Sequence, residues 1–435
     1  MRAPWPAASS CLVVLLAAAA GLTACGSSEE ETPTTAAPAG GETPLDLTIG
    51  DIVPLTGDLA DFGPPGRKAA DLAVEQIQEG IDEAGVDHQV SIQHEDEQTD
   101  PQAAVDAART LTGDDATCLT GAWASADTIP VARSVSAREG ALQISPASTS
   151  DEITTLEDEG LLNRTVPPDS LQGPALADAM EEELGGAEGT TVNIGARNDA
   201  YGTGLADAFR AAWEEKGGVI GQEVVYDPEQ PSYNSEATQL TEGEPDAYAI
   251  FDFPETFGKV GPALVRTGNY DASTAFVTDG LASDSLPDDV GEEGTEGTRG
   301  TRPGAPDEGA PSEAFDELYT EAGGEDRQTF DAQNFDAVML CYLAAVAAGS
   351  TDGAEMAAQV GAVSGPGGTK YTWEELPEAI EALQNGEDID YEGASGPVDL
   401  NEAGDATAGV YDLFEYTDGA LEVTGEVPIE PGAEE

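Results

Sequence analysis

His88 and His94 are the only histidines in this chain of 435 residues, and Glu95 and Asp96 directly follow the second. The two imidazoles stand six residues apart around a segment of alternating polarity, so both would point to one face of a β-strand. Imidazoles and carboxylates gathered in this way are typical ligands of a metal ion. No further ligands accompany them, so we favour a partly exposed strand at a sheet edge and predict no metal and no cofactor.

Catalytic patterns are weak elsewhere in the chain. Neither histidine has a nucleophile partner in a recognisable context, which gives little support to a secreted Ser-His-Asp hydrolase. Neither nucleotide-binding glycine pattern occurs, and Gly365-Pro366-Gly367-Gly368 is interpreted as a flexible loop. We therefore predict that the protein is not an enzyme.

The four cysteines fall into two groups. Cys11 and Cys25 belong to the first 25 residues, whereas Cys118 lies in an apolar strand-like segment and Cys341 in an apolar helical one. Cys118 and Cys341 could pair outside the cell, but we favour two buried free thiols.

The charge is extreme, with 86 Asp and Glu against 16 Lys and Arg and a formal net charge of -70. Such a surface repels polyphosphate and anionic lipid, which argues against nucleic acid or a lipid surface as a partner through a basic patch. The hydrophobic fraction of 39% argues for a folded chain. Self-repulsion of this size is screened near molar salt, where the Debye length is about 3 Å, so we interpret the composition as halophilic.

The N-terminal segment is typical of a targeting signal rather than of a folded domain. Residues 1–24 hold an apolar run that is shorter than the roughly 20 residues needed to cross a bilayer, as in a secretory signal peptide. The segment ends in Leu22-Thr23-Ala24-Cys25-Gly26, which resembles a bacterial lipobox and implies a lipid on Cys25. Residues 25–44 are predicted to be a flexible linker and residues 429–435 an acidic tail. We therefore expect a lipid-anchored protein on the extracellular face of the cell membrane.

The body alternates strand and helix from Leu45 onward. Apolar runs of strand length recur at residues 47–53, 90–93, 118–120, 141–144, 191–194, 248–251 and 275–278. Helical periodicity occupies residues 66–79, 101–111, 201–216 and 312–322. This alternation predicts an α/β protein with doubly wound parallel sheets, in which a ligand binds at the carboxyl ends of the strands.

Several separated pieces at the expected strand exits resemble the leucine/isoleucine/valine-binding protein family, the type I periplasmic solute-binding proteins of ABC transporters. The ordered pieces are Pro54-Leu55-Thr56-Gly57, Asp100-Pro101, Ser145-Pro146-Ala147-Ser148-Thr149, Arg164-Thr165-Val166, Gln172-Gly173, Asp199-Ala200-Tyr201-Gly202 and Asp279-Gly280. The resemblance implies two lobes joined by a three-strand hinge. Lobe one would hold residues 45–166 and 301–393, and lobe two would hold residues 167–300 and 394–428.

The resemblance also implies a ligand site. Ser125, Ala147 and Thr149 would cradle the carboxylate and ammonium groups of a zwitterion from lobe one, while Asp279 would pair with the ammonium from lobe two. The remaining predicted ligand-binding residues form a side-chain pocket and are Tyr201, Phe62, Trp123 and Phe251. Phe251 stands in the wall segment Phe251-Asp252-Phe253, and the resemblance leaves open which of these three residues faces the ligand. Trp123 departs from the family, which usually has a smaller residue there, so a branched aliphatic ligand is in doubt.

The leading hypothesis is a monomeric, lipid-anchored binding protein that captures an amino acid, branched-chain or otherwise apolar ones included, for the permease subunits of an ABC importer. A surface ligand-sensing receptor of the same fold is one alternative. A binding protein for an amide, urea or a carboxylate is another, and the role of Asp279 separates it from the first. The ligand's identity is not fixed by the sequence.

The charge leads to a first prediction. The melting temperature should rise between about 0.1 and 3 M KCl, because salt screens the repulsion among the acidic side chains. Thermal unfolding followed across this range checks the expectation. A melting temperature that stays constant would contradict the halophilic interpretation.

Overall fold

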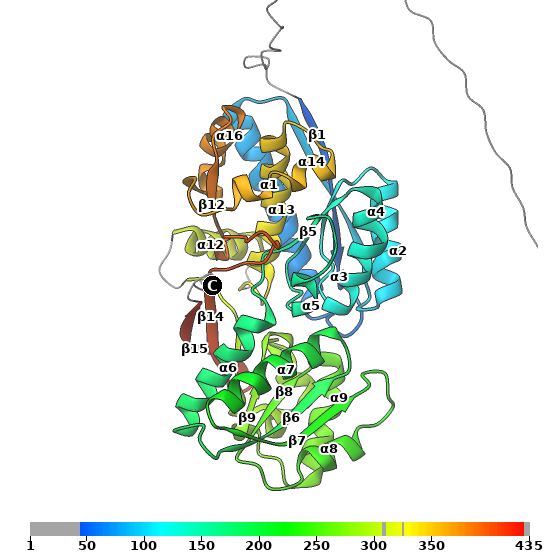
Figure 1. Ribbon diagram of the computed structural model, residues 1–435, viewed down its shortest axis with the longest axis vertical. Coiled ribbons are helices and arrows are strands. Elements are labelled where there is room, and N and C mark those ends of the chain that lie inside the picture. The colour runs from blue at the N-terminus through cyan, green and yellow to red at the C-terminus, as the bar shows by residue number, and fades with distance from the viewer. Residues whose placement is uncertain (1–43, 307–309, 324–325, 430–435) are drawn as a thin grey trace, which may run out of the picture. The chain divides into compact units, whose positions relative to one another are not determined.

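The computed structural model describes residues 44–306, 310–323 and 326–429. The predicted leader, the predicted lipidation site Cys25 and nearly all of the predicted linker lie outside these residues, as does the end of the predicted tail. Among the described residues, no helix is both long and apolar enough to cross a bilayer. Figure 1 shows the described chain with its elements labelled.

The first sheet has five parallel strands in the order β2-β1-β3-β4-β5. Their bounds are Leu45–Val53 for β1, His88–Asp96 for β2, Cys118–Thr120 for β3, Leu142–Ser145 for β4 and Leu162–Arg164 for β5. Strands β3 and β4 are buried throughout, as expected where helices cover both faces of a parallel sheet. The parallel α/β class predicted from the sequence is confirmed.

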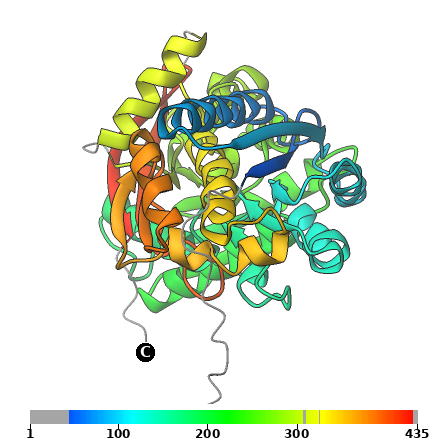
Figure 2. The same cartoon turned by 90° about the horizontal axis from the view of Figure 1, so that it is seen from above.

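Two long helices, α1 and α13, run side by side on this sheet (Figure 2). Helix α1 spans Gly63–Ala84, starts with prolines in its first turn and ends at Gly85 in the left-handed conformation. Helix α13 spans Asp331–Ala348 and is buried from Asp331 to Val346, so it forms the centre of the lobe-one core. The other helices packed in this lobe are α2 (Pro101–Gly113), α3 (Ser125–Val131), α4 (Ala137–Glu139), α5 (Asp151–Thr154), α12 (Ala310–Gly323), α14 (Gly353–Ala357), α15 (Val360–Val363) and α16 (Leu376–Gln384).

The second sheet has seven strands in the order β15-β14-β10-β9-β8-β6-β7. Its strands span Thr191–Arg197 for β6, Val219–Tyr226 for β7, Ala247–Phe251 for β8, Ala275–Val277 for β9, Arg299–Pro303 for β10, Gly409–Thr417 for β14 and Ala420–Ile429 for β15. Helices of lobe two are α6 (Asp169–Leu184), α7 (Ala200–Glu215), α8 (Asn234–Leu240), α9 (Pro254–Thr267), α10 (Leu286–Val290) and α11 (Glu292–Thr295).

Part of the second sheet is antiparallel, which the sequence pattern did not predict. Strand β14 pairs antiparallel with both β10 and β15. The hairpin turns at Asp418 and Gly419, both with positive φ, and an Asp-Gly pair is a strong hairpin signal. Strand β15 also takes in Ile429, the first residue of the predicted acidic tail.

The chain after residue 393 stays with lobe one for longer than the family resemblance implies. A small sheet pairs β11 (Thr369–Thr372) with β12 (Ile389–Gly393), and β12 with β13 (Gly396–Pro397). Ala394, Val398, Leu400 and Ala406 share the core of α13. We therefore propose that the third crossing between the lobes comes after Ala406 rather than at 394.

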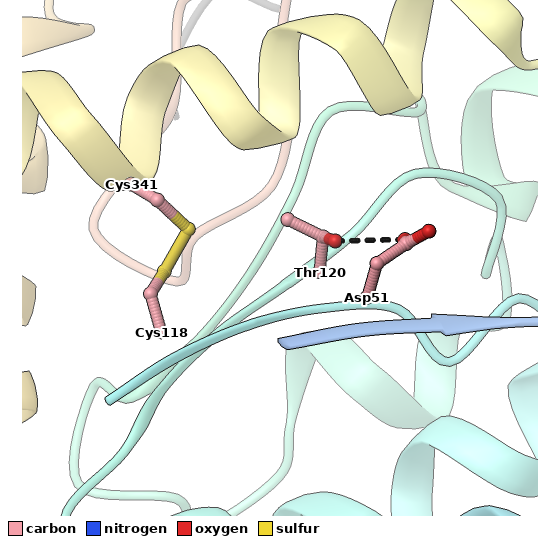
Figure 3. The surroundings of a disulfide bond; sticks show 4 residues. All are labelled: Asp51, Cys118, Thr120 and Cys341. Carbon is pink, nitrogen blue, oxygen red and sulfur yellow. Dashed lines mark hydrogen bonds between the residues drawn. A yellow bond between two sulfur atoms is a disulfide. The ribbon is translucent and has the colours of Figure 1, made fainter. Parts of the chain in front are cut away.

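Cys118 and Cys341 form a disulfide, so the preference for two free thiols is wrong. The bond joins the start of β3 to the middle of α13, with the Cα atoms 6.0 Å apart (Figure 3). Both residues are fully buried, and near them Thr120 Oγ1 donates to Asp51 Oδ1 at 2.9 Å. The sequence placed each cysteine in its element but gave no sign that the helix crosses this strand.

Removing the disulfide should lower the stability of lobe one. The bridge closes a loop of 223 residues, and loss of such a constraint typically costs about 2–4 kcal/mol. Thermal unfolding of Cys118→Ala/Cys341→Ala beside the parent protein measures the cost. Alkylation of denatured, unreduced protein supplies the control, and two reactive thiols from these positions would contradict the bond.

Candidate functional site

A small cavity lies where strand ends of the two lobes face each other. The space between its lining atoms is about 240 Å³, part of which is open to solvent. The residues that line it are Leu59, Trp123, Ala124, Ser125, Ala147, Tyr201, Phe253, Asp279, Gly280 and Phe330.

The lobe-one side of the cavity follows strands β3 and β4. Ser125 opens helix α3, and its Oγ accepts from the Ser150 backbone N–H at 3.2 Å. The preceding loop is fixed by hydroxyl groups, since Ser145 Oγ donates to the Ala122 carbonyl at 2.7 Å and Ser148 Oγ to that of Trp123 at 2.9 Å. These bonds hold the N-terminal end of α3, with its free backbone N–H groups, toward the cavity.

Gly121 makes this loop possible. It has φ +103°, and a Cβ there would come within 2.2 Å of the Ile52 carbonyl oxygen. Only glycine fits this close approach between β3 and β1.

The lobe-two side is built around Asp279 and Tyr201. Asp279 directly follows β9 and Tyr201 lies in the first turn of α7, next to the end of β6. The Tyr201 hydroxyl donates to Asp279 Oδ1 at 3.1 Å and accepts from the Gly280 N–H at 3.1 Å. It also lies 2.8 Å from the Thr278 hydroxyl, so the phenol ring has a fixed position.

Burial raises the pKa of Asp279 to about 6, although hydrogen bonds from Gln172 and Tyr201 oppose the shift. Burial also raises the pKa of Asp169, at the start of α6, well above its usual range, and the charge of Asp279 adds to this. A carboxylate whose ionised form is destabilised by burial gains most from a cation brought into contact with it.

Comparison with Asp336 shows what distinguishes Asp279. Asp336 is equally buried, and burial raises its pKa to about 6. It accepts hydrogen bonds from the Tyr391 hydroxyl, the Ala394 N–H and both the N–H and hydroxyl of Ser395. Asp336 therefore has its donors within the fold, whereas Asp279 faces a cavity.

Three predicted site residues do not line the cavity. Thr149 is fully buried, and a hydrogen bond from its side chain lowers the pKa of Asp169 against the effect of burial. Phe62 lies behind the wall, with its ring 5.7 Å from that of Phe330. Phe251 packs in the lobe-two core, 5.8 Å from Phe209, and Phe253 takes the place in the wall that was expected for it.

The cavity brings together Ser125, Ala147, Trp123, Tyr201 and Asp279, all of which the family resemblance had indicated. Trp123 is buried between Gly66 of α1 and the cavity, and its indole N–H has no partner in the described structure. A buried indole N–H of this kind usually finds an acceptor.

Sequence reasoning missed Phe330 and Leu59. Phe330 precedes α13 in the left-handed conformation, with φ 73°, and its ring meets that of Trp123 edge-on at 5.9 Å. A bulky residue held at positive φ is a typical mark of a functional site. Nothing in the local sequence indicates this conformation, because Phe330 reaches the cavity from a segment 207 positions away from Trp123.

The two histidines have structural partners. His88 Nδ1 lies 2.9 Å from the Tyr342 hydroxyl, while His94 lies between Asp51 at 2.7 Å and Asp71 at 3.0 Å. Within the described part of the chain, no three His, Cys, Asp or Glu side chains are grouped to hold a metal ion. Strand β2 is at the edge of its sheet, although His88 itself is buried.

Comparisons with known proteins agree with this geometry. A family model for periplasmic binding proteins matches residues 46–420. A Leu/Ile/Val-binding protein homolog of Brucella melitensis is 27% identical over 384 residues, which cover 86% of this chain and 93% of the relative. Two solved structures share the fold across most of both chains. They are LivJ of Streptococcus pneumoniae in complex with isoleucine (TM-score 0.72, 20% identity, 88% of this chain and 99% of that one) and a solute-binding protein of R. palustris in complex with benzoate (TM-score 0.68, 18%, 89% and 98%).

The buried carboxylates lead to a pH prediction for the unliganded protein. Burial raises the pKa of Asp252 to about 7 and that of Asp279 to about 6, above their values in the unfolded chain. The folded state therefore binds more protons than the unfolded state between about pH 4 and 7, so these groups lower stability as the pH rises through that window. The melting temperature at constant KCl should be higher near pH 5 than near pH 8.

Asn mimics the protonated side chain, so Asp279→Asn and Asp252→Asn should each flatten this pH dependence. Asp46→Asn, which changes an exposed carboxylate of β1, is the matched control. An equal pH slope in all four proteins would show that the buried acids do not cause it.

Proposed function

Because this chain belongs to the periplasmic binding protein family, we propose that it is an extracytoplasmic binding protein that captures an α-amino acid and delivers it to an ABC importer. The lipobox-like sequence before Cys25 supports a lipid anchor on that cysteine. The protein performs no covalent chemistry in this proposal. Its work is to bind, to close and to present the closed shape to the permease.

The observation that carries the proposal is the pairing of unlike groups across one small cavity. Lobe one offers the Ser125 hydroxyl and the N-terminal end of α3, both suited to a carboxylate. Lobe two offers Asp279, an acceptor suited to an ammonium group. A zwitterion satisfies both ends at once, and closure removes the water that would weaken both contacts.

The Ala147 backbone carbonyl gives the ammonium group a second acceptor on the lobe-one side. Thr149 is too far back to line the cavity as described, so we assign it a supporting rather than a contacting role. The amino acid would then bridge the lobes, and only the closed protein would hold both of its charged ends.

The rest of the cavity wall selects the side chain. Leu59, Phe253, Phe330 and the Trp123 ring make it apolar and narrow. Such a wall favours a flat or compact side chain over a bulky branched one. The unpartnered Trp123 N–H favours a side chain that carries a hydrogen-bond acceptor.

An aromatic carboxylate is the second candidate ligand. The aromatic wall favours it, and one neighbour of the same fold is solved with benzoate. Such a ligand lacks an ammonium group, so it would gain nothing from an ionised Asp279. The two candidates therefore differ in what Asp279 does.

A thermal-shift screen in about 2–3 M KCl tests the proposal with the twenty amino acids, urea, short amides and small carboxylates. We expect a stabilising shift with a subset of the α-amino acids. Asp279→Asn should then weaken binding by at least about 30-fold, since truncating one partner of a buried charge pair costs 2 kcal/mol or more. Affinity should also fall as the pH drops through about 6, where Asp279 becomes protonated.

Asp46→Asn again serves as the control, and its affinity should equal that of the parent. Shifts caused only by compounds without an amino group would support the carboxylate candidate and remove Asp279 from its role. No shift with any compound would contradict the amino-acid proposal.

A further inference from the structure

Arg197, at the end of β6, is almost fully buried among carboxylates, with 4% of its side chain exposed. Its guanidinium bonds to Asp199 through Nε and lies 3.7 Å from Asp252 through Nη1. The Cζ atom of the guanidinium also lies over the ring of Phe253, 3.7 Å from the ring centroid. The two carboxylates on its own lobe thus place this cation against a residue that lines the ligand cavity.

A third carboxylate reaches Arg197 from the opposite lobe. Asp58, in the loop between β1 and α1, accepts from Arg197 Nη2 at 3.0 Å and from Thr256 Oγ1 at 2.9 Å. Both donors belong to lobe two, whereas Asp58 belongs to lobe one. Both contacts join the two lobes, so a hinge motion that separates the lobes would break them.

From Phe253 the contacts continue to the predicted ammonium anchor. The Phe253 ring stacks on that of Tyr201 at 4.9 Å with an interplanar angle of 23°. The Tyr201 hydroxyl then donates to Asp279. The path from the lobe-one loop to the anchor therefore runs through one ion pair, two ring contacts and one hydrogen bond.

We propose that Asp58 and Arg197 are positioning residues that couple closure of the lobes to the shape of the ligand-binding wall. Asp58 completes the set of acceptors that holds the guanidinium over the Phe253 ring, and Phe253 holds Tyr201 against Asp279. Neither Asp58 nor Arg197 lines the cavity. The inference rests on the proposed function only in taking the cavity wall to bind a ligand. The coupling between the two lobes can be tested without any ligand.

One physical point favours Arg over Lys at this position, and a second concerns the effect of salt on its contacts. Its planar guanidinium stacks on an aromatic face while its five N–H groups reach several carboxylates, which an ammonium group cannot do. Arg197 is nearly fully buried, so salt screens its contacts less than those of an exposed pair.

A neighbouring contact supplies the matched control. Asp61, three residues after Asp58, accepts from Ser283 Oγ at 2.7 Å and also bonds to Ser285. It therefore joins the same loop to lobe two without touching Arg197 or the ring stack. Asp58→Asn and Asp61→Asn each remove one charge from the same loop, and they differ in the partner that is lost.

Hydrogen exchange of the purified, unliganded protein tests the coupling. In Asp58→Asn, amide exchange should rise at least about threefold in residues 57–62 and also in residues 200–204 and 252–257 of lobe two. In Asp61→Asn it should rise in residues 57–62 and 282–286 and stay at the parent level in the other two segments. Arg197→Lys, which keeps the charge but loses the planar guanidinium, should reproduce the rise in residues 200–204 and 252–257.

Unchanged exchange of residues 200–204 and 252–257 in Asp58→Asn would overturn the proposal. An equal rise of those segments in Asp61→Asn would also overturn it, because general loosening of closure would then explain both variants. Asp58 lies in a partly exposed loop, so Asp58→Asn tests the coupling even where Arg197→Lys does not fold.

A second readout uses as its probe whichever of the twenty amino acids gives the largest thermal shift in the screen. Asp58 and Tyr201 do not contact each other. If the substitutions Asp58→Asn and Tyr201→Phe acted independently, their separate losses of affinity would multiply in the double variant. Under the proposal, the loss in the double variant departs from that product by more than about threefold. Should the parent protein bind none of the twenty amino acids, the amino-acid proposal fails while the exchange experiment still decides the coupling.

Discussion

This fold buries many more carboxylates than cations, and the arrangement of its interior depends on how each buried acid is satisfied. Arg164 and Arg197 are the buried cations of the described residues, against a set of buried acids that includes Asp51, Glu97, Asp252, Asp279 and Asp336. A buried charge without a partner is costly, so hydroxyl and backbone N–H groups must serve most of these acids. Asp336 accepts hydrogen bonds from four such groups within the fold, whereas the carboxylate of Asp279 lines the cavity.

The two buried arginines are placed where the lobes meet. Arg164 pairs with Asp405 at 2.7 Å and donates to the Ser148 and Ser150 carbonyls, and so fixes the first crossing beside the lobe-one part of the site. Arg197 joins Asp58 across the closed lobes. A chain with few basic residues thus uses its buried cations at the hinge and at the closing edge, where the geometry of the site is decided.

The sequence predicts the fold class because hydrophobic period and strand length are local properties. The strand at Cys118–Thr120 was predicted to the residue, and the family resemblance brought Ser125, Ala147, Tyr201 and Asp279 to one site. What was missed depends on contacts between distant segments. Phe330 and the Cys118–Cys341 bond both require knowing where α13 packs, and the choice of Phe253 over Phe251 depends on where β8 ends. Strand β8 ends at Phe251, whereas Phe253 directly precedes α9 and lines the cavity.

The overall charge cannot choose the ligand. At low salt a net charge of -70 would attract cations and repel anions over long distances. Near molar salt the Debye length is about 3 Å, which is shorter than the distance from the surface acids to a ligand in the cavity. Discrimination between a zwitterion and a carboxylate therefore falls to groups in direct contact with the ligand. Asp279 is the one carboxylate among the residues that line this cavity. We infer that its protonation state, and the contacts that hold Tyr201 against it, determine which small molecule the protein retains.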